Sequence, residues 1–495
     1  MPLDVTSRLQ EAEGNAPVST RVQKASVPLY ANRIKVYPKA VTGKFRTIKW
    51  VILTVCLSVY YLVPWLRWDR GPGQPDQAVL IDMPGRRAYF FAIEIWPHEI
   101  YFLAGLLILG AVSLFLVTSL LGRVWCGYAC PQTVWTDLFM LVERWIEGDR
   151  NARMKLDQQP LSWSKAAKKV AKHAAWLVIA AGTGGAWVFY FTDAPTAFAN
   201  IFTGQASVTV YFFVGLFTTT TYLLAGWARE QVCTYMCPWP RFQAAMLDEH
   251  SLVVTYEKWR GEPRGKHKAG TSWDGRGDCI DCRQCVAVCP TGIDIRNGQQ
   301  LECIGCGLCI DACNAVMEKI GRPQDLIRFD TLLNQQARAR GEPARYKLLR
   351  PRTILYALLL ATIVTVMLVA FLLRPTVEVS VLRDRAPLFV TLSDGAIRNG
   401  YTLKILNKTN ADRTYTLSLT GVPSAKVNVI RAGDESADEP VVLSAKADSV
   451  ATYRIYVTAP AHAIEAESTP LVFTLRDRDG KGSAEYHSVF LGPER

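Results

Sequence analysis

Hydrophobic residues occur in five long runs separated by polar segments, and each run approaches the length of a membrane-spanning helix. A helix needs roughly 20 apolar residues to cross a hydrocarbon core of about 30 Å. The runs are Trp50 to Leu66, Ile100 to Leu121, Ala174 to Phe191, Val208 to Ala228 and Thr353 to Leu373. The pattern therefore predicts five transmembrane α-helices. The first follows 49 mostly polar residues and is predicted to be an uncleaved signal anchor.

The distribution of positive charge predicts how these helices are oriented. The net charge is +12, and Lys plus Arg number 9 in residues 1–49, 4 in 67–99, 9 in 122–173, none in 192–207 and 19 in 229–352. Cytoplasmic loops carry the excess of Lys and Arg. We therefore expect a multi-pass protein of the bacterial inner membrane, with its N-terminus and long fourth loop in the cytoplasm and its C-terminal tail in the periplasm. The same distribution argues against a nucleic-acid partner.

The segment after the fifth run has a different pattern, in which apolar and polar residues alternate over short stretches. Examples are Tyr401 to Leu406, Tyr415 to Leu419, Tyr453 to Val457 and Leu471 to Leu475, separated by clusters of Gly, Asn, Asp and Pro. Six or seven such strands in about 120 residues are typical of an immunoglobulin-like β-sandwich. The segment contains no Cys and no catalytic cluster, so we expect a docking module.

These patterns divide the chain into five expected parts. They are a cytoplasmic N-terminal segment (1–49), a four-helix membrane core (50–250), a cytoplasmic cysteine-containing domain (251–350), a fifth transmembrane helix (351–374) and a periplasmic immunoglobulin-like β-sandwich (375–495). The third part contains two tandem CxxCxxCxxxC runs, Cys279 to Cys289 and Cys303 to Cys313, which are typical of bacterial dicluster ferredoxins. The predicted fold class is therefore a multidomain membrane protein with an inserted bacterial dicluster ferredoxin-like α+β domain.

Eight of the 13 cysteines stand in two tandem CxxCxxCxxxC runs within the third part. In bacterial dicluster ferredoxins the fourth Cys of each run ligates the other cluster. We therefore assign Cys279, Cys282, Cys285 and Cys313 to one 4Fe-4S cluster, and Cys303, Cys306, Cys309 and Cys289 to a second. Structural zinc is the alternative for eight cysteines, but two complete runs favour iron–sulfur.

Four further cysteines form an internal repeat at the predicted cytoplasmic ends of the second and fourth runs. Cys126 and Cys130 stand in CGYACP, and Cys233 and Cys237 in CTYMCP, 107 residues later. Proline is favoured at the first position of a helix, so Cys130 and Cys237 are predicted N-caps of helices that begin at Pro131 and Pro238. Thiols at such positions ionise more readily. These four are candidate catalytic redox residues and candidate ligands of copper or of an additional iron–sulfur centre, although buried structural Cys is the simpler alternative.

The remaining candidate ligands predict less. Cys56 lies alone in the first run and is interpreted as a packing residue. Only His98 and His173 flank apolar runs, and the predicted topology places them at opposite faces of the membrane. A membrane haem with two histidine ligands is therefore not expected. His98 is interpreted as an interfacial helix-start residue.

With these motifs in place, the chain resembles a known family, the accessory proteins of cbb3-type cytochrome c oxidase (CcoG/FixG/RdxA). The resemblance covers nearly the whole chain and includes LYANRIKVYPKAVTGKFRTIKW, WCGYACPQTVW, GWAREQVCTYMCPWPRFQ, RGEPRG, CVAVCPTGIDIRNG and ECIGCGLCIDAC. It implies two 4Fe-4S clusters, an immunoglobulin-like periplasmic end and a role in oxidase maturation through reduction of Cu(II) to Cu(I). The departures at Arg283 and Asn314 concern only the tuning of the clusters.

The resulting hypothesis is a membrane oxidoreductase in which electrons pass from a cytoplasmic donor, not identified by the sequence, through the dicluster domain to the repeated thiols. Expected partners are the oxidase and its copper-delivery proteins, and a homodimer is left open. Two alternatives remain at this point. One is a quinol-linked membrane ferredoxin, and the other is a non-catalytic assembly scaffold whose clusters sense redox state.

Overall fold

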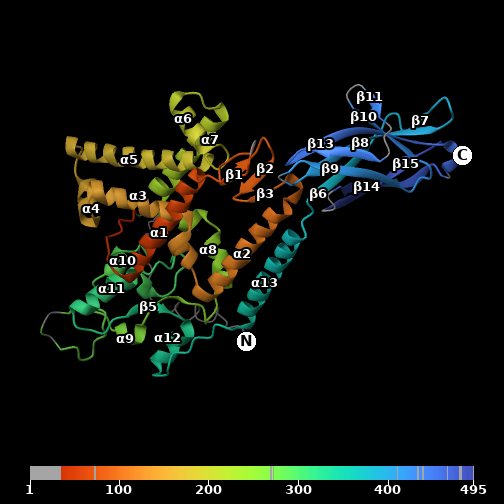
Figure 1. Cartoon of the computed structure of the whole chain (residues 1–495). Coiled ribbons are helices and arrows are strands. Elements are labelled where there is room, and N and C mark those ends of the chain that lie inside the picture. The colour runs from red at the N-terminus through yellow and green to blue at the C-terminus, as the bar shows by residue number, and fades with distance from the viewer. Residues whose placement is uncertain are drawn as a thin grey trace, which may run out of the picture.

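The computed structural model describes residues 35–71, 74–267, 270, 272–409, 411–431, 434–436, 440–464, 466–478 and 482–493. Most of the predicted N-terminal segment, residues 1–34, lies outside the described residues. Figure 1 shows a helical body, a small α+β part below it and a β-sandwich at the far end of the paired helices α2 and α13. The predicted multidomain architecture is confirmed.

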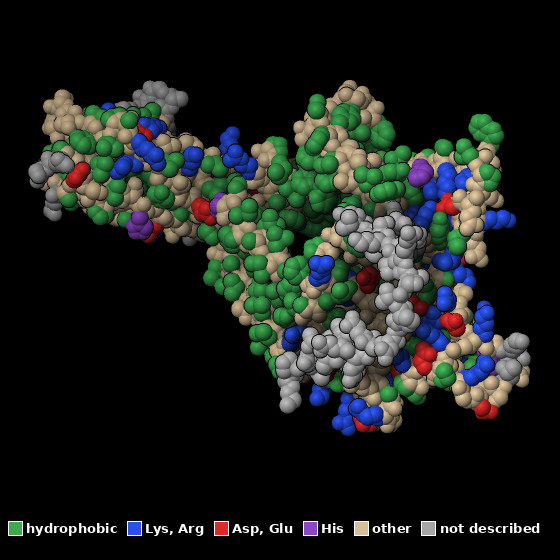
Figure 2. All heavy atoms as spheres, turned by 180° about the vertical axis from the view of Figure 1, so that it is seen from behind, with side chains coloured by type: hydrophobic (Ala, Val, Ile, Leu, Met, Phe, Trp, Pro, Cys, Tyr) green, Lys and Arg blue, Asp and Glu red, His purple; other side chains and the backbone are tan. Residues whose placement is uncertain are grey.

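Four helices of the described chain are long and apolar enough to cross a membrane. They span Lys44–Trp65, Pro97–Leu121, Val208–Ala228 and Pro351–Leu372. Their cores are α1 (Lys44–Leu62), α2 (Tyr101–Leu121), α7 (Val208–Thr221) with its continuation η4 (Tyr222–Ala228), and α13 (Pro351–Leu372). Their outward side chains are apolar, and Figure 2 shows hydrophobic side chains over this part of the surface. Such a surface suits a lipid environment.

The third predicted run lies in α5 (Trp163–Val188), which is not among these four helices. Its first half carries Lys165, Lys169 and Lys172, and the apolar half contains a Gly-Thr-Gly-Gly stretch, so its hydropathy is lower. The small residues permit close packing against α7. A Cβ added at Gly184 would lie 2.7 Å from the Val214 carbonyl oxygen.

Shorter elements complete the helical body. They are η1 (Val63–Trp65), η2 (Pro97–Glu99), α3 (Pro131–Glu147), α4 (Arg150–Gln158), α6 (Ala194–Thr203), α8 (Trp239–Met246) and an antiparallel sheet of β1 (Val79–Asp82), β2 (Arg87–Phe90) and β3 (Ile93–Ile95). Side-chain caps fix two helix starts, because Ser162 accepts from the Lys165 N–H at 3.2 Å and Asp193 accepts from the Thr196 N–H at 3.2 Å.

The α+β part is closed by an antiparallel pair, β4 (Val253–Tyr256) and β5 (Ile327–Asp330), with Val253 opposite Asp330. The cysteine runs lie between these strands in chain order. They are interspersed with α9 (Lys258–Gly261), α10 (Gln284–Ala287), η6 (Ile295–Asn297) and α11 (Leu308–Lys319), and α12 (Leu332–Ala339) follows β5. Val254, Ile295 and Ile310 pack with the thiols in one hydrophobic cluster.

The C-terminal part is a sandwich of two antiparallel sheets, ordered β11-β10-β13-β8-β6 with β7 paired to β8, and β12-β9-β14-β15. The strands are β6 (Val377–Arg383), β7 (Val390–Thr391), β8 (Ile397–Asn407), β9 (Arg413–Thr420), β10 (Lys426–Arg431), β11 (Asp434–Ser436), β12 (Val441–Ala445), β13 (Ser449–Ala459), β14 (Ser468–Asp477) and β15 (Ser483–Leu491). This is more than the six or seven predicted, because short strands such as β7 show too few alternations to be recognised. Tyr401, Leu403 and Phe473 are fully buried between the sheets.

Ion pairs hold the sandwich against the membrane end of the helical body. Glu99, at the start of α2, accepts from both Lys408 and Arg374 at 2.7 Å. Arg87 of β2 pairs with Asp448 at 2.7 Å. The sandwich is therefore fixed to the helices by buried charges as well as by chain connection.

Candidate redox and metal site

The repeated cysteine segments adopt the same backbone conformation. Each is one turn of π-helix, η3 (Trp125–Ala129) and η5 (Val232–Met236), and each ends at the second cysteine of its repeat. The Cys130 N–H donates to the Trp125 carbonyl at 2.9 Å, and the Cys237 N–H donates to the Val232 carbonyl at 2.8 Å. Single π-helical turns are frequent at functional sites. The internal repeat is therefore structural as well as sequential.

Of the two predicted cysteine N-caps, one is confirmed by the structure. Cys130 is the N-cap of α3, which begins at Pro131. The second prediction is wrong by one residue, because α8 begins at Trp239 and Pro238 itself is the N-cap. Pro238 has helical φ and ψ of −76° and −17°, so Cys237 lies one position outside the cap.

The fold brings the four repeated thiols together. Burial raises the pKa of Cys233 to about 12, and the Cys130, Cys126 and Cys237 thiols add to the shift because their negative charges would repel one another. Burial likewise raises the pKa of Cys126. Exposure increases from the buried Cys126 through Cys130 and Cys233 to the exposed Cys237, so the group is accessible at Cys237.

The eight remaining candidate thiols all lie in the α+β part. Burial raises the pKa of Cys313 to about 12, and the thiols that reinforce the shift are Cys285, Cys282 and Cys279. Burial also raises the pKa of Cys309 well above its usual value. The thiols that reinforce this shift most are Cys306, Cys303 and Cys289. We call these groups the first set (Cys279, Cys282, Cys285 and Cys313) and the second set (Cys289, Cys303, Cys306 and Cys309).

The two sets supply the number and type of ligands that a pair of 4Fe-4S clusters requires. All eight are free thiols, so no disulfide competes for them. The members of the second set line a single small cavity, together with Cys285 of the first set and apolar side chains such as Ile293 and Ile295. A cavity lined by thiols and apolar side chains is a suitable environment for a cluster ligated by thiolates.

The second set lies directly against the repeated thiols. Cys126 and Cys233 pack in one hydrophobic cluster with Cys306 and Cys309. The Tyr128 hydroxyl donates to the Cys306 carbonyl at 3.0 Å. All three groups of thiols therefore form one continuous series, from the first set through the second to the repeat.

Charged residues that sequence reasoning did not single out fix the α+β part to α1. Asp311, between two cysteines of the second run, accepts from the Phe45 and Arg46 backbone N–H groups at 3.2 and 2.8 Å. It thereby caps the first membrane helix from another part of the chain. Behind it, Asp137 pairs with Arg46 at 3.1 Å and with Lys49 at 3.0 Å, all almost completely buried.

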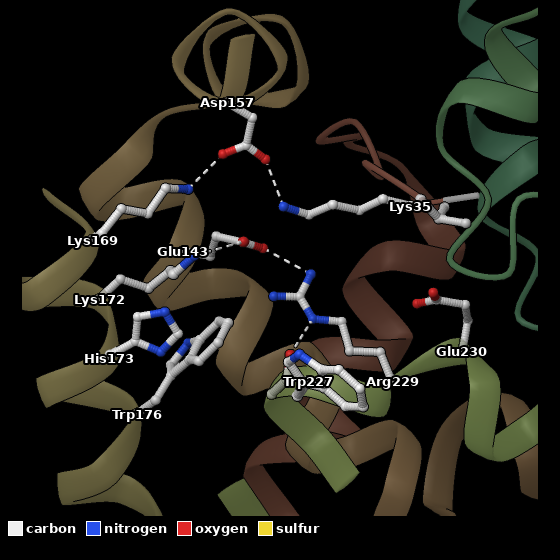
Figure 3. A pocket seen from close by; sticks show the side chains of 12 residues that line it. Lys35, Glu143, Asp157, Lys169, Lys172, His173, Trp176, Trp227, Arg229 and Glu230 are labelled. Atoms are coloured by element: carbon white, nitrogen blue, oxygen red, sulfur yellow. Dashed lines mark hydrogen bonds and ion pairs between the residues drawn. The ribbon is translucent and has the colours of Figure 1, made fainter. Parts of the chain in front are cut away.

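A cavity of about 400 Å³ beside α3 and α5 is lined by paired charges (Figure 3). At its centre Glu143 contacts Arg153 at 2.8 Å, Arg229 at 2.9 Å and Lys172 at 3.6 Å. Although burial alone would raise it, the pKa of Glu143 is lowered to about 2, with Arg229 the largest favourable influence. Arg229 has a positive φ of 45° and lies four residues before Cys233, so this network fixes the chain entering the second repeat.

The other candidates from the sequence lie away from the thiols. His98 contacts Glu378 at 3.1 Å and lies with Glu99 near the β-sandwich, where Lys408 and Arg374 already neutralise the carboxylates. Cys56 is half-buried in α1. Neither residue is part of the thiol series.

Comparison with known protein families identifies the same parts of the chain. Three family models match: a 4Fe-4S dicluster domain over residues 228–332, an immunoglobulin-like fold at the C-terminus of FixG over 367–493, and a 4Fe-4S binding domain over 103–148, which contains the first repeat. The nitrogen fixation protein FixG of Rhizobium meliloti is 51% identical over 462 residues, covering 88% of each chain. The chain belongs to the FixG/RdxA family. Protein RdxA of Cereibacter sphaeroides is 52% identical over 88% of this chain and 91% of its own, and protein RdxB of the same organism is 49% identical over 94% and 97%.

Membership of the FixG/RdxA family confirms the resemblance inferred from the motifs. A crystal structure of a FixG-related protein from Vibrio parahaemolyticus is also similar, at 23% identity over 23% of this chain and 95% of its own, with a TM-score of 0.20. The protein is therefore a membrane-associated iron–sulfur redox protein with an immunoglobulin-like C-terminal domain.

Proposed function

We propose that this FixG/RdxA-family protein reduces Cu(II) to Cu(I) at the repeated thiols, in support of the maturation of cbb3-type cytochrome c oxidase. The observation that carries the proposal is the continuous series of thiols that ends at an open, soft-ligand site. The role in oxidase maturation comes from the family resemblance. Thiolates favour Cu(I) over harder cations, so binding at the repeated thiols would favour the reduced form of the ion.

In this proposal the first set and the second set each hold one 4Fe-4S cluster, which when bound supplies a one-electron carrier. The protein residues do the rest. Asp311 and Tyr128 hold the second set against the repeat. Cys126 and Cys233 face that set, while the exposed Cys237 provides the entrance for the ion. Each Cu(II) takes up one electron and leaves as Cu(I), so one turnover needs one electron from the donor.

The proposed orientation places the α+β part in the cytoplasm and the β-sandwich in the periplasm. It rests on the excess of Lys and Arg in residues 122–173 and 229–352. An electron donor would then reach the first set from the cytoplasm. Accessibility of single engineered cysteines to an impermeant thiol reagent in intact cells would test this orientation.

The reductase proposal is tested with anaerobically purified full-length protein. Cys126→Ala and Cys233→Ala are expected to lose most Cu(II) reduction while retaining the absorption and EPR signals of both clusters. Cys56→Ala, outside the thiol series, is the matched control and should reduce copper normally. Unchanged rates in both repeat variants would refute the proposal.

A second candidate, quinol oxidation, is favoured by one observation. An apolar cavity of about 380 Å³ lies between α3, α5 and α7, and its wall includes Pro131 and Gln132, which directly follow Cys130. A quinol would enter such a cavity from the lipid. Reoxidation of the reduced clusters by a soluble quinone analogue, in the absence of copper, would favour this function.

A further inference from the structure

Arg123 is a buried cation that lies between the second set and the repeated thiols. It is 8% exposed and follows the C-terminal end of α2, three residues before Cys126. Its Nη1 donates to the Leu301 carbonyl, two residues before Cys303. One guanidinium therefore joins the start of the first repeat to the loop that carries the second cysteine run.

The same guanidinium is joined to Cys126 through a buried glutamine. Gln243 of α8, 1% exposed, accepts from Arg123 Nε at 3.2 Å and from Cys126 Sγ at 3.1 Å through its single oxygen. Its amide nitrogen donates to Thr118 at 3.3 Å. Because that donor is used, the orientation of Gln243 is fixed, with its oxygen towards Arg123 and Cys126.

Arg123 forms none of the ion pairs found in the described part of the chain. The buried cations around it are different, since Lys49 and Arg46 share Asp137 and Arg229 pairs with Glu143. An uncompensated charge in the protein interior is costly. The group joined to it is a thiol, because the single oxygen of Gln243 accepts from both Arg123 Nε and Cys126 Sγ.

Neutral thiols would leave this cation uncompensated. Four thiolates bound to one Cu(I) would compensate it, because their four negative charges exceed the single positive charge of the ion and the group remains an anion. A 4Fe-4S cluster with four thiolates is also an anion. The buried arginine thus matches a metal–thiolate centre at the repeat and does not match four structural cysteines.

We propose that Arg123 is the counter-cation of an anionic metal–thiolate centre formed by Cys126, Cys130, Cys233 and Cys237, shared with the second set. The inference rests on the proposed function in placing a soft metal at the repeat. It adds the residue that stabilises the metal-bound state. Arg123 acts here as a positioning residue through charge and hydrogen bonds.

The test measures Cu(I) affinity of full-length protein by competition with a chromophoric Cu(I) chelator, together with iron and sulfide content. Arg123→Gln should weaken Cu(I) binding at least about tenfold, because the anionic centre loses its buried counter-cation. Arg123→Lys keeps the charge and should retain most of the affinity. Arg241→Gln, an exposed arginine of α8, removes the same charge and should change nothing.

A second variant avoids dependence on the folding of Arg123→Gln. Gln243→Glu has nearly the same shape and gives Arg123 a carboxylate partner, so it should weaken Cu(I) binding in the same direction. Equal Cu(I) affinity in wild type, Arg123→Gln and Gln243→Glu, with iron content unchanged, would overturn the inference.

The iron analysis separates the two metals. If the repeat holds iron, the wild type contains a third cluster's worth of iron and sulfide, and Arg123→Gln and Gln243→Glu lose that third while Arg241→Gln keeps it. Retention of all iron in both variants would then refute the role of Arg123. The metal-binding assay and the reductase assay fail independently. If wild-type protein reduces no Cu(II) but Arg123→Gln and Gln243→Glu still weaken metal binding, the reductase proposal is refuted and the role of Arg123 stands.

Discussion

Substitution of Gly127 by alanine tests whether the contact between the repeat and the second set is needed. Gly127 lies between the two cysteines of the first repeat. A Cβ added there would meet the Ile304 carbonyl oxygen at 2.9 Å, the Gly305 carbonyl oxygen at 3.0 Å and the Cys306 Cα at 3.0 Å. All three are backbone atoms of the loop that carries the second set. None can move away by changing a rotamer.

The expected cost follows from that geometry. The φ of Gly127 is not in the left-handed region, so alanine meets no conformational penalty there and the effect is purely steric. Overpacking a close-packed contact costs about 1–3 kcal/mol. Because the helical body and the α+β part meet here, we expect the strain to separate the second set from the repeat rather than to unfold either part.

The assay combines stability and electron transfer. Gly127→Ala should lose the visible absorbance of its clusters at a lower temperature than wild type and should reduce Cu(II) more slowly at equal cluster content. Gly110→Ala in α2 is the matched control, because a Cβ there meets nothing within 4 Å. Wild-type stability and wild-type copper reduction in Gly127→Ala would refute the argument that this contact is tight and functional.

Three further outcomes are expected from the buried charges. Glu143→Ala should destabilise the protein by about 3–5 kcal/mol in thermal unfolding, because it leaves buried cations unpaired, whereas Glu342→Ala removes an exposed pair and should have little effect. Since the folded pKa of Glu143 is about 2 against an ordinary 4.5, its stabilisation should be complete above about pH 5 and be lost as the pH falls towards 2, and Glu143→Gln should flatten that part of a stability–pH profile. Lys49→Met should lower the reduction potential of one cluster only, because the positive charge of Lys49 acts on the second-set thiol Cys306. A redox titration followed by EPR measures both potentials. Lys49→Arg keeps the charge and should leave both potentials unchanged.

The candidate site was predictable from the sequence to the extent that it depends on local spacing. Short turns between neighbouring cysteines bring the thiols of one run together whatever lies around them, and the membrane helices follow from the length of apolar runs. The cross-over of Cys289 and Cys313 came from the pattern of bacterial ferredoxins. The convergence of the two repeats followed from their equal position after a helical hairpin.

Residues that act across the chain could not be found this way. Asp311 caps α1 over a separation of 265 residues, and Gln243 meets Cys126 over 117. In the sequence Asp311 is one of many acidic residues, and Arg123 is one of many positive charges in the loops between apolar runs. Nothing in their neighbours marks them as buried, since burial is decided by which distant surface packs on them.

The sequence by itself thus determined the class of this protein, its runs of cysteines and four of its five predicted membrane segments, because periodicity and spacing act within a few residues. The tertiary structure decided how these pieces are joined: the second set against the repeat, α1 capped by Asp311, and Arg123 buried between two groups of thiols. Those contacts depend on the packing of segments remote in the chain. Because charges interact more strongly in the low-dielectric interior, each such contact determines which buried charges need an oppositely charged partner and which residue provides it.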